Sequence, residues 1–229
     1  MIERRGGARA SDRAYEVLIS QIQSGELPPG AVIGEVDQAE RLGISRTPMR
    51  EAIGRLVADG LVRQQSARVL VVSGFDVADI RALFETRRAL EEMAARLAAQ
   101  RGDRAVFTEI ADDFERSRPE MGGESTDAYY ALIAGFDAAV DSAVANVYLS
   151  QALRPVRSHL VRARQLARDN SERLRASAAE HGLIARAIAE GDADLAAHAT
   201  HVHLHRALAA ILASIADSSA SDSPQKGRS

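Results

Sequence analysis

Cysteine and tryptophan are both absent from the 229 residues of this chain. Without thiols there can be no disulfide framework, cysteine-ligated zinc or iron-sulfur cluster, so a transition metal would need histidine and carboxylate ligands. Aromatic residues make up only 4% of the chain, although 46% of it is apolar. Because alanine and leucine supply most of that apolar content, the composition predicts a core of closely packed helices.

Long apolar runs are missing as well. The sequence has no stretch of about eighteen apolar residues, the length needed to cross a membrane. Its first ten residues carry charge but lack the apolar segment of a secretory signal. We therefore expect a cytoplasmic protein with no membrane partner.

The charge is weakly acidic overall but unevenly placed. The formal net charge is −3, whereas residues 41–68 hold six arginines against Glu51 and Asp59, a local net charge of +4. A short positive patch on an acidic protein is a candidate surface for nucleic acid.

Helix and turn signals alternate over the first 75 residues. Ser11 can open a helix, Gly43 can end one, and Ser66 with Ala67 can form a tight turn between two β-branched runs. The predicted elements are a flexible tail over 1–10, helices over 11–24, 35–42 and from residue 46, and strands over 61–65 and 68–72. This order of elements is the one that a winged helix-turn-helix needs.

The third predicted helix carries the residues suited to DNA. Ser45 can cap it, and Pro48 lies in its first turn, where a missing N–H is harmless. Arg46, Thr47 and Arg50 lie on its outward side, and two arginines at i and i+4 can enter a major groove together. A solvated charged face is the alternative interpretation. The apolar positions expected to face inward are Met49, Ile53, Leu56 and Val57.

The stretch LISQIQSGELPPGAVIGEVDQAERLGISRTPMREAIGRLVADGLV strongly resembles the winged-helix domain of GntR-family transcription regulators. The resemblance rests on the SGxLPPG turn, the LGxSRTPxREAxxxL helix and the DGLV exit. It implies a DNA-binding domain over 11–73. Val36 stands where relatives usually have an arginine, and Val69 where they usually have a wing glycine. The DNA-contacting residues that the resemblance implies are Ser45, Arg46, Thr47 and Arg50.

From Asp76 onward the chain is expected to be helical, which gives a mainly α fold. Breaks at glycine, proline, asparagine and aspartate separate six helices, and the polar end of the chain predicts a disordered tail over 217–229. The helices expected within the second domain, 76–216, cover 76–100, 103–117, 125–143, 147–168, 171–189 and 192–216.

Three features of the helical part are the stretch FETRRALEEMAARLAAQ, the stretch FDAAVDSAVANVYL and the spacing of the later histidines. Together they resemble the FadR-like branch of the family, whose all-helical domain binds an effector. Many relatives bind a metal there through an Asp, a His four residues later, and two further His. Those positions here are Ile133, Asp137, His181 and His203, so one ligand is missing and another has changed type.

The residues themselves support an inward-facing polar group. Asp137 shares a helical face with apolar neighbours, and a buried carboxylate needs a partner. His181 lies on another apolar stripe. Two interpretations stay open: core histidines with satisfied hydrogen bonds, or a site in which Asp137, His181 and His203 hold zinc, nickel or manganese.

The remaining candidates are three histidines and one arginine. His198, His201 and His205 share a helix face away from His203 and are expected on a partly exposed surface. Arg87 can form an i,i+4 ion pair with Glu91, or reach into a cavity to bind the carboxylate of an effector.

These features predict a ligand-responsive transcription regulator, such as a repressor. It would bind a palindromic operator in double-stranded DNA as a homodimer, with a small anionic metabolite, an organic acid, as effector. The alternatives are a metal-dependent enzyme built on the Asp/His/His site and a regulator without any effector. The enzyme is disfavoured because it leaves the first 75 residues unexplained.

Overall fold

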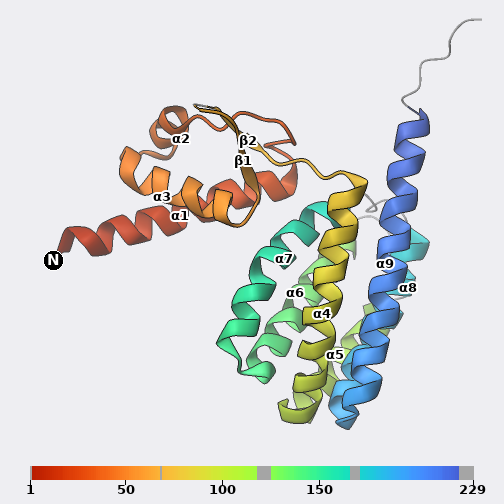
Figure 1. Ribbon diagram of the computed structural model, residues 1–229. Helices are drawn as coiled ribbons and strands as arrows, with labels where there is room; N and C mark the ends of the chain where they lie inside the picture. The colour runs from red at the N-terminus through yellow and green to blue at the C-terminus, as the bar shows by residue number, and fades with distance from the viewer. Residues whose placement is uncertain (1, 68, 118–124, 166–170, 222–229) are drawn as a thin grey trace, which may run out of the picture. The chain divides into compact units, whose positions relative to one another are not determined.

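The computed structural model describes residues 2–67, 69–117, 125–165 and 171–221 (Figure 1). The chain divides into two compact units. The first consists of Met1–Asp76 with Arg157–Arg162, and the second of Val77–Val156 with Ala163–Ser229. The mainly α fold class agrees with the sequence.

Within Met1–Asp76, the described residues of the first unit form three helices and a two-stranded ribbon. Its core combines the inward faces of the helices with residues of the ribbon, including the fully buried Leu18, Met49, Leu56 and Val72. The elements are α1 Ile2–Ser24, α2 Glu35–Leu42, α3 Arg46–Ala58, β1 Val62–Ser66 and β2 Val69–Val72.

The turn between α2 and α3 depends on Gly43. This residue has φ 63°, a left-handed conformation that a side chain disfavours, and its N–H and the next one cap the last carbonyls of α2. Ser45 then occupies the N-cap position of α3, as predicted. The geometry of this turn places the start of α3 against α2.

The ribbon is the predicted pair of strands. β1 and β2 are antiparallel, with Val62 opposite Val72 and Gln64 opposite Leu70, and an irregularity in the pairing follows Gln64. Val62, Val71 and Val72 are buried at one end of the ribbon, whereas the other four residues of β1 are exposed.

Two details of the first unit correct the sequence prediction. α1 begins at Ile2, not at Ser11, so residues 2–10 continue the helix in place of a separate tail. Extending an established helix costs little per residue, so Ser11 need not cap it. Val57 is 40% exposed, because the inward stripe of α3 is narrower than predicted.

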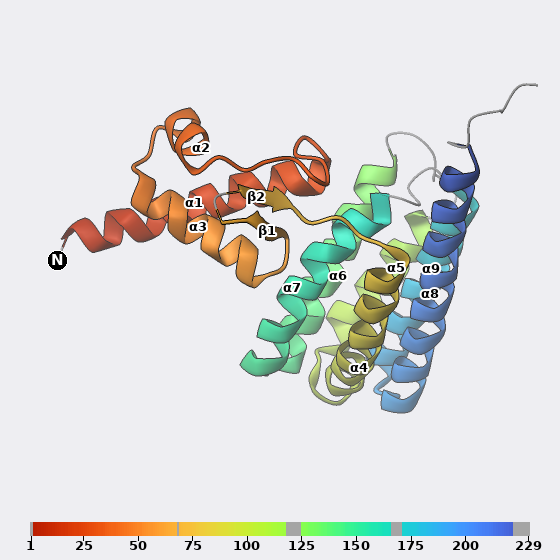
Figure 2. The same ribbon diagram turned by 45° about the horizontal axis from the view of Figure 1, so that its top comes forward.

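The second unit is built from six described helices. α4 lies beside α9 in both views of the ribbon (Figures 1 and 2), α5 packs on α8, and α8 packs on α9. The helices are α4 Val77–Arg101, α5 Arg104–Ser117, α6 Ser125–Val144, α7 Val147–Gln165, α8 Ser171–Glu190 and α9 Ala193–Ser221.

Small residues let these helices approach closely. Ala98, Ala111, Ala178 and Ala185 are completely buried between them. Three phenylalanines supply the bulk: Phe114 meets Phe136 edge to face at 5.9 Å, and Phe107 meets Phe136 at 6.4 Å. The predicted alanine-rich helical core is confirmed.

The predicted helix boundaries in this unit agree with the structure to within one or two residues, except at two places. Residues 166–168 of the fourth predicted helix lie outside the described residues. α9 continues to Ser221 and so includes the first part of the predicted tail, since alanine and serine prolong the helix without a break. Residues 222–229 also lie outside the described part.

Candidate DNA-binding surface and effector site

The predicted DNA-contacting residues form one exposed group at the start of α3. Ser45, Arg46, Thr47 and Arg50 are all exposed, whereas Met49, Ala52, Ile53 and Leu56 on the opposite side of the helix are buried. The hydroxyl of Ser45 makes no capping hydrogen bond in the described structure. The first turn of α3 therefore presents two guanidinium groups and two hydroxyl groups on one surface.

Both arginines contact one carboxylate, that of Glu35 at the start of α2. Arg50 donates from Nε to Oε2 at 3.0 Å and from Nη2 to Oε1 at 2.9 Å, and Arg46 donates from Nε to Oε1 at 3.2 Å. The hydrogen bond from Arg50, opposed by partial burial and aided by Arg46, keeps the pKa of Glu35 below its usual value. Glu35 is thus ionised at neutral pH.

In the second unit, Arg87 is a buried arginine with a carboxylate partner. Its side chain is 2% exposed and donates from Nε and Nη2 to both oxygens of Glu91, at 2.8 and 3.1 Å. Its guanidinium carbon lies 4.5 Å from the centre of the Phe84 ring. The predicted i,i+4 ion pair is confirmed, and its burial distinguishes it from a surface pair.

His181 is held by contacts on both its ring and its Nδ1 atom. Nδ1 lies 2.8 Å from the carbonyl oxygen of Ser177 and 3.1 Å from the hydroxyl of Tyr129. A carbonyl oxygen can only accept, so Nδ1 carries the proton and, in the neutral ring, the lone pair is at Nε2. Phe114 stacks on the imidazole at 5.2 Å between ring centres.

His203 belongs to a buried ionic cluster centred on Glu180. Glu180 accepts hydrogen bonds from Arg173 at 2.9 and 2.7 Å, from Nδ1 of His203 at 2.8 Å, and from Arg206 at 3.3 Å. Burial raises the pKa of the Glu180 carboxyl, but hydrogen bonds from His203 and Arg173 outweigh it and lower the pKa to about 2. Burial also lowers the pKa of His203, so its ring is neutral at pH 7.

The three predicted metal ligands are only partly brought together. The rings of His181 and His203 lie 4.3 Å apart, centre to centre, and both residues are buried as predicted. Asp137 is half-buried, because it lies roughly 40° around α6 from the buried Ile133, on the flank of the apolar stripe. Within the described ranges, no group of three or more His, Cys, Asp or Glu side chains could hold a metal ion. The residues therefore fit two ligand positions and leave a third unfilled.

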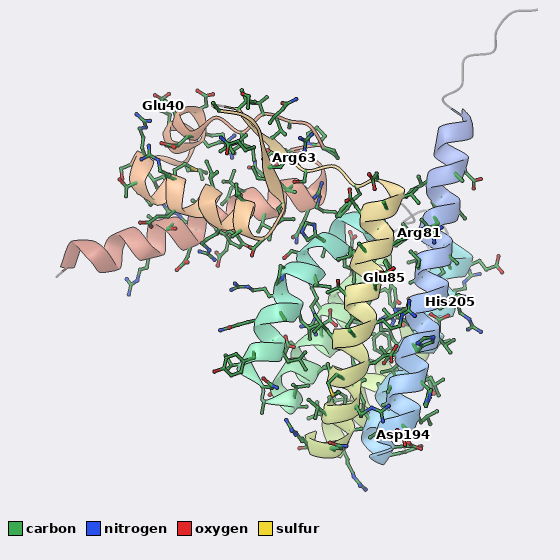
Figure 3. The ribbon with its side chains drawn as sticks, in the orientation of Figure 1. Glu40, Arg63, Arg81, Glu85, Asp194 and His205 are labelled. Atoms are coloured by element: carbon green, nitrogen blue, oxygen red, sulfur yellow. The ribbon has the colours of Figure 1, made fainter. Side chains whose placement is uncertain are left out.

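The other histidines of α9 lie on its outer side, as expected. His198, His201 and His205 are exposed, and His205 is labelled on α9 in Figure 3. Nδ1 of His201 lies 2.8 Å from Oε1 of Glu92. Nδ1 of His198 lies 2.7 Å from the backbone carbonyl oxygen of Asp194, in the preceding turn. They form no part of the buried cluster.

Sequence reasoning missed three residues of these sites: Glu35, Tyr129 and Glu180. An acidic residue in the first turn of α2 is a favourable helix start, which gave Glu35 an ordinary explanation. Tyr129 is 2% exposed, and a buried aromatic residue of an amphipathic helix has an ordinary explanation as part of the core. Each of the three residues acquires its partner only through tertiary packing.

No helix in the parts of the chain that the structure covers combines the length and hydropathy needed to span a membrane.

Two known domain families match this chain. The family described as "Bacterial regulatory proteins, gntR family" matches residues 10–72, and the FCD domain family matches residues 82–206. These ranges coincide with the winged-helix unit and most of the helical unit.

Individual relatives are also bacterial regulators. An uncharacterized HTH-type transcriptional regulator from Streptomyces ambofaciens is 31% identical over 83% of this chain and 80% of its own length. A probable D-xylose utilization operon transcriptional repressor from Paenarthrobacter nicotinovorans is 29% identical over 85% of both chains. A match to a regulator from Agrobacterium vitis, 41% identical, spans 36% of this chain and 48% of that protein.

Solved structures agree on the fold. E. coli McbR/YncC has a TM-score of 0.73 at 21% identity, covering 90% of this chain and 98% of that one. A putative GntR regulator from Rhodococcus sp. RHA1 has a TM-score of 0.69 at 23% identity, covering 89% and 97%.

Proposed function

This chain belongs to the GntR family of bacterial regulatory proteins, with an FCD domain after its winged helix, and we propose that it is a ligand-responsive DNA-binding transcription regulator. The observation that carries the proposal is the exposed group at the start of α3, formed by Ser45, Arg46, Thr47 and Arg50. In a winged helix the start of this helix enters the major groove. Arginine forks match the O6/N7 edge of guanine, and hydroxyl groups suit phosphate oxygens.

We expect a homodimer on a palindromic operator, because one winged helix reads only a half-site. α9 supports self-association. Leu204 and Ile211 are buried within the chain, but Leu208, Leu212 and Ile215 are only half-buried. A second copy would cover this remaining apolar surface.

The effector we propose is a small organic acid bound in the helical unit. Arg87, Arg173 and His203 gather donors for an anion in a buried setting, which strengthens charge-assisted hydrogen bonds. In the absence of effector, Glu91 and Glu180 take the place of its carboxylate. An anion that displaced one of them would change how α4, α8 and α9 pack, and differential affinity for the two arrangements would control DNA binding.

Divalent metal binding at His181 and His203 is a second candidate role of the helical unit. Both rings hold their Nδ1 proton toward an acceptor, and such anchoring is typical of histidines that bind metal through Nε2. Since the third ligand is not in place, water or an effector carboxylate would complete the coordination. The metal would supply a positive charge for an anionic ligand.

DNA recognition is tested by replacing the two arginines separately. A random-sequence duplex library selected with the wild-type protein provides the operator probe. Arg46→Ala and Arg50→Ala should each weaken binding to it by about 1–3 kcal/mol in fluorescence anisotropy. Arg175→Ala, an exposed arginine of α8, makes the same charge change in the other unit and should leave binding unchanged. Wild-type protein that selects no sequence would refute the function, and two arginine variants with wild-type affinity would remove α3 from the interface.

A further inference from the structure

Glu35 holds two DNA-facing arginines at once. Its side chain is 24% exposed, whereas those of Arg46 and Arg50 are 64% and 68% exposed. The carboxylate is therefore the inner partner, and the two guanidinium groups lie outside it. Glu35 comes from the first turn of α2, where the positive end of the helix dipole favours its charge.

The contacts use the inner edge of each guanidinium group. Arg46 contacts Glu35 through Nε, and Arg50 through Nε and Nη2. A guanidinium also has an end formed by Nη1 and Nη2, and this fork suits the O6/N7 edge of guanine. Glu35 thus holds both arginines through their inner edges, and Nη1 of each makes no contact with its carboxylate.

A carboxylate in this place also acts on the DNA backbone. Arginines at a protein surface bind phosphate as readily as base edges, and phosphate contacts carry no sequence information. A negative charge beside both arginines repels phosphate oxygens and offsets part of the positive charge of the patch. It disfavours the non-specific binding mode more than the base-reading one.

We propose that Glu35 is a specificity-determining residue, which orients Arg46 and Arg50 toward guanine edges and keeps them from binding phosphate. The inference rests on the proposed function, since it requires that α3 reads DNA. Glu35 itself needs no contact with a base. It acts through the two arginines and is a positioning residue.

Glu35→Gln is the test, because glutamine keeps the size of the side chain and loses its charge. Glu40→Gln is the matched control: Glu40, labelled on α2 in Figure 3, is exposed and lies in the same helix. Both variants lose one negative charge, but only the first removes the carboxylate that the two arginines contact. Thermal unfolding of each variant establishes that the fold is intact.

The readouts are base preference and salt dependence. Selection from a random duplex library, followed by sequencing, should give a defined half-site for the wild type and for Glu40→Gln. For Glu35→Gln, discrimination at the guanines of that half-site should fall by roughly tenfold. Affinity for random-sequence DNA should rise by roughly three- to tenfold, with the slope of log K against log salt steeper by about 0.9 for each new phosphate contact.

The outcomes separate the inference from the function beneath it. If the wild type selects no sequence, the proposed function fails. If the wild type selects a half-site and Glu35→Gln selects the same one with unchanged discrimination, the function stands and the role of Glu35 is refuted. Equal gains in random-DNA affinity for both variants would also refute it, because net charge alone would then explain the change.

Discussion

Replacing Glu180 with glutamine should destabilise the helical unit more than any exposed carboxylate substitution. The change removes the charge that Arg173, 14% exposed, and His203, 6% exposed, both contact. A carboxyl pKa that falls from 4.5 in the unfolded chain to about 2 in the folded protein is worth about 3 kcal/mol at neutral pH, since each tenfold change in an ionisation constant equals about 1.4 kcal/mol. The loss of a buried partner by Arg173 acts in the same direction.

The pH dependence has a definite sign. Because the folded pKa of Glu180 is depressed, its contribution is complete above about pH 4.5 and is lost as the pH falls toward 2. The pKa of His203 is lowered by burial as well, so its protonation below pH 6.5 also favours unfolding. The gap between wild type and Glu180→Gln should therefore be full above about pH 4.5 and should shrink as the pH falls below it.

Scanning calorimetry and urea unfolding at a series of pH values measure this gap. A loss of about 3 kcal/mol corresponds to roughly 6–12 °C in Tm for a unit of this size. Glu92→Gln is the matched control, because Glu92 also pairs with a histidine of α9 but is 31% exposed, and it should cost less than about 1 kcal/mol. Equal effects of the two substitutions, or a gap for Glu180→Gln that acid does not narrow, would refute the reasoning.

Three further outcomes follow from the proposed function. Leu212→Glu should shift the protein from dimer to monomer in sedimentation velocity at micromolar concentration, and a wild type that is already monomeric would contradict the dimer. Titration calorimetry with zinc, nickel and manganese should give binding that His181→Ala removes and that Ile133→Asp, which adds a hard anionic ligand, strengthens; no heat in any of the proteins would exclude the metal. An organic acid at 100 times its Kd should stabilise the wild type by about 2.7 kcal/mol in a thermal-shift screen and stabilise Arg87→Lys less; identical shifts would place the acid elsewhere.

Local sequence signals were sufficient for most of the fold. Gly43 and Gly191 end helices because each has positive φ, and the sequence predicts a helix end at both places. The long helices were predictable because the apolar periodicity and the positions of the helix-breaking residues indicate the same helix boundaries. α1 departs from its prediction because a capping serine does not have to be a helix start.

The sites were predictable in composition but not in pairing. The exposed group at the start of α3 follows from one amphipathic helix, so its residues could be named from the sequence. The partners Glu35 and Glu180 depend on which helices pack together, and they are 11 and 23 residues from Arg46 and His203. The sequence places Asp137 in one candidate site with His181 and His203. In the structure the acidic partner of His203 is Glu180, the residue before His181 in the chain.

Burial determines what each glutamate–arginine cluster can do. Around Glu180 the carboxylate, Arg173 and His203 are nearly inaccessible, so rearranging them requires an ionic partner that replaces the lost contacts. An anion is such a partner, which is why this cluster suits an effector that changes helix packing. Around Glu35 the arginines are about two-thirds exposed, and water and salt already compete with the contact. The arginines can therefore exchange part of that pairing for a guanine edge, while the negative charge of Glu35 still disfavours a phosphate beside them.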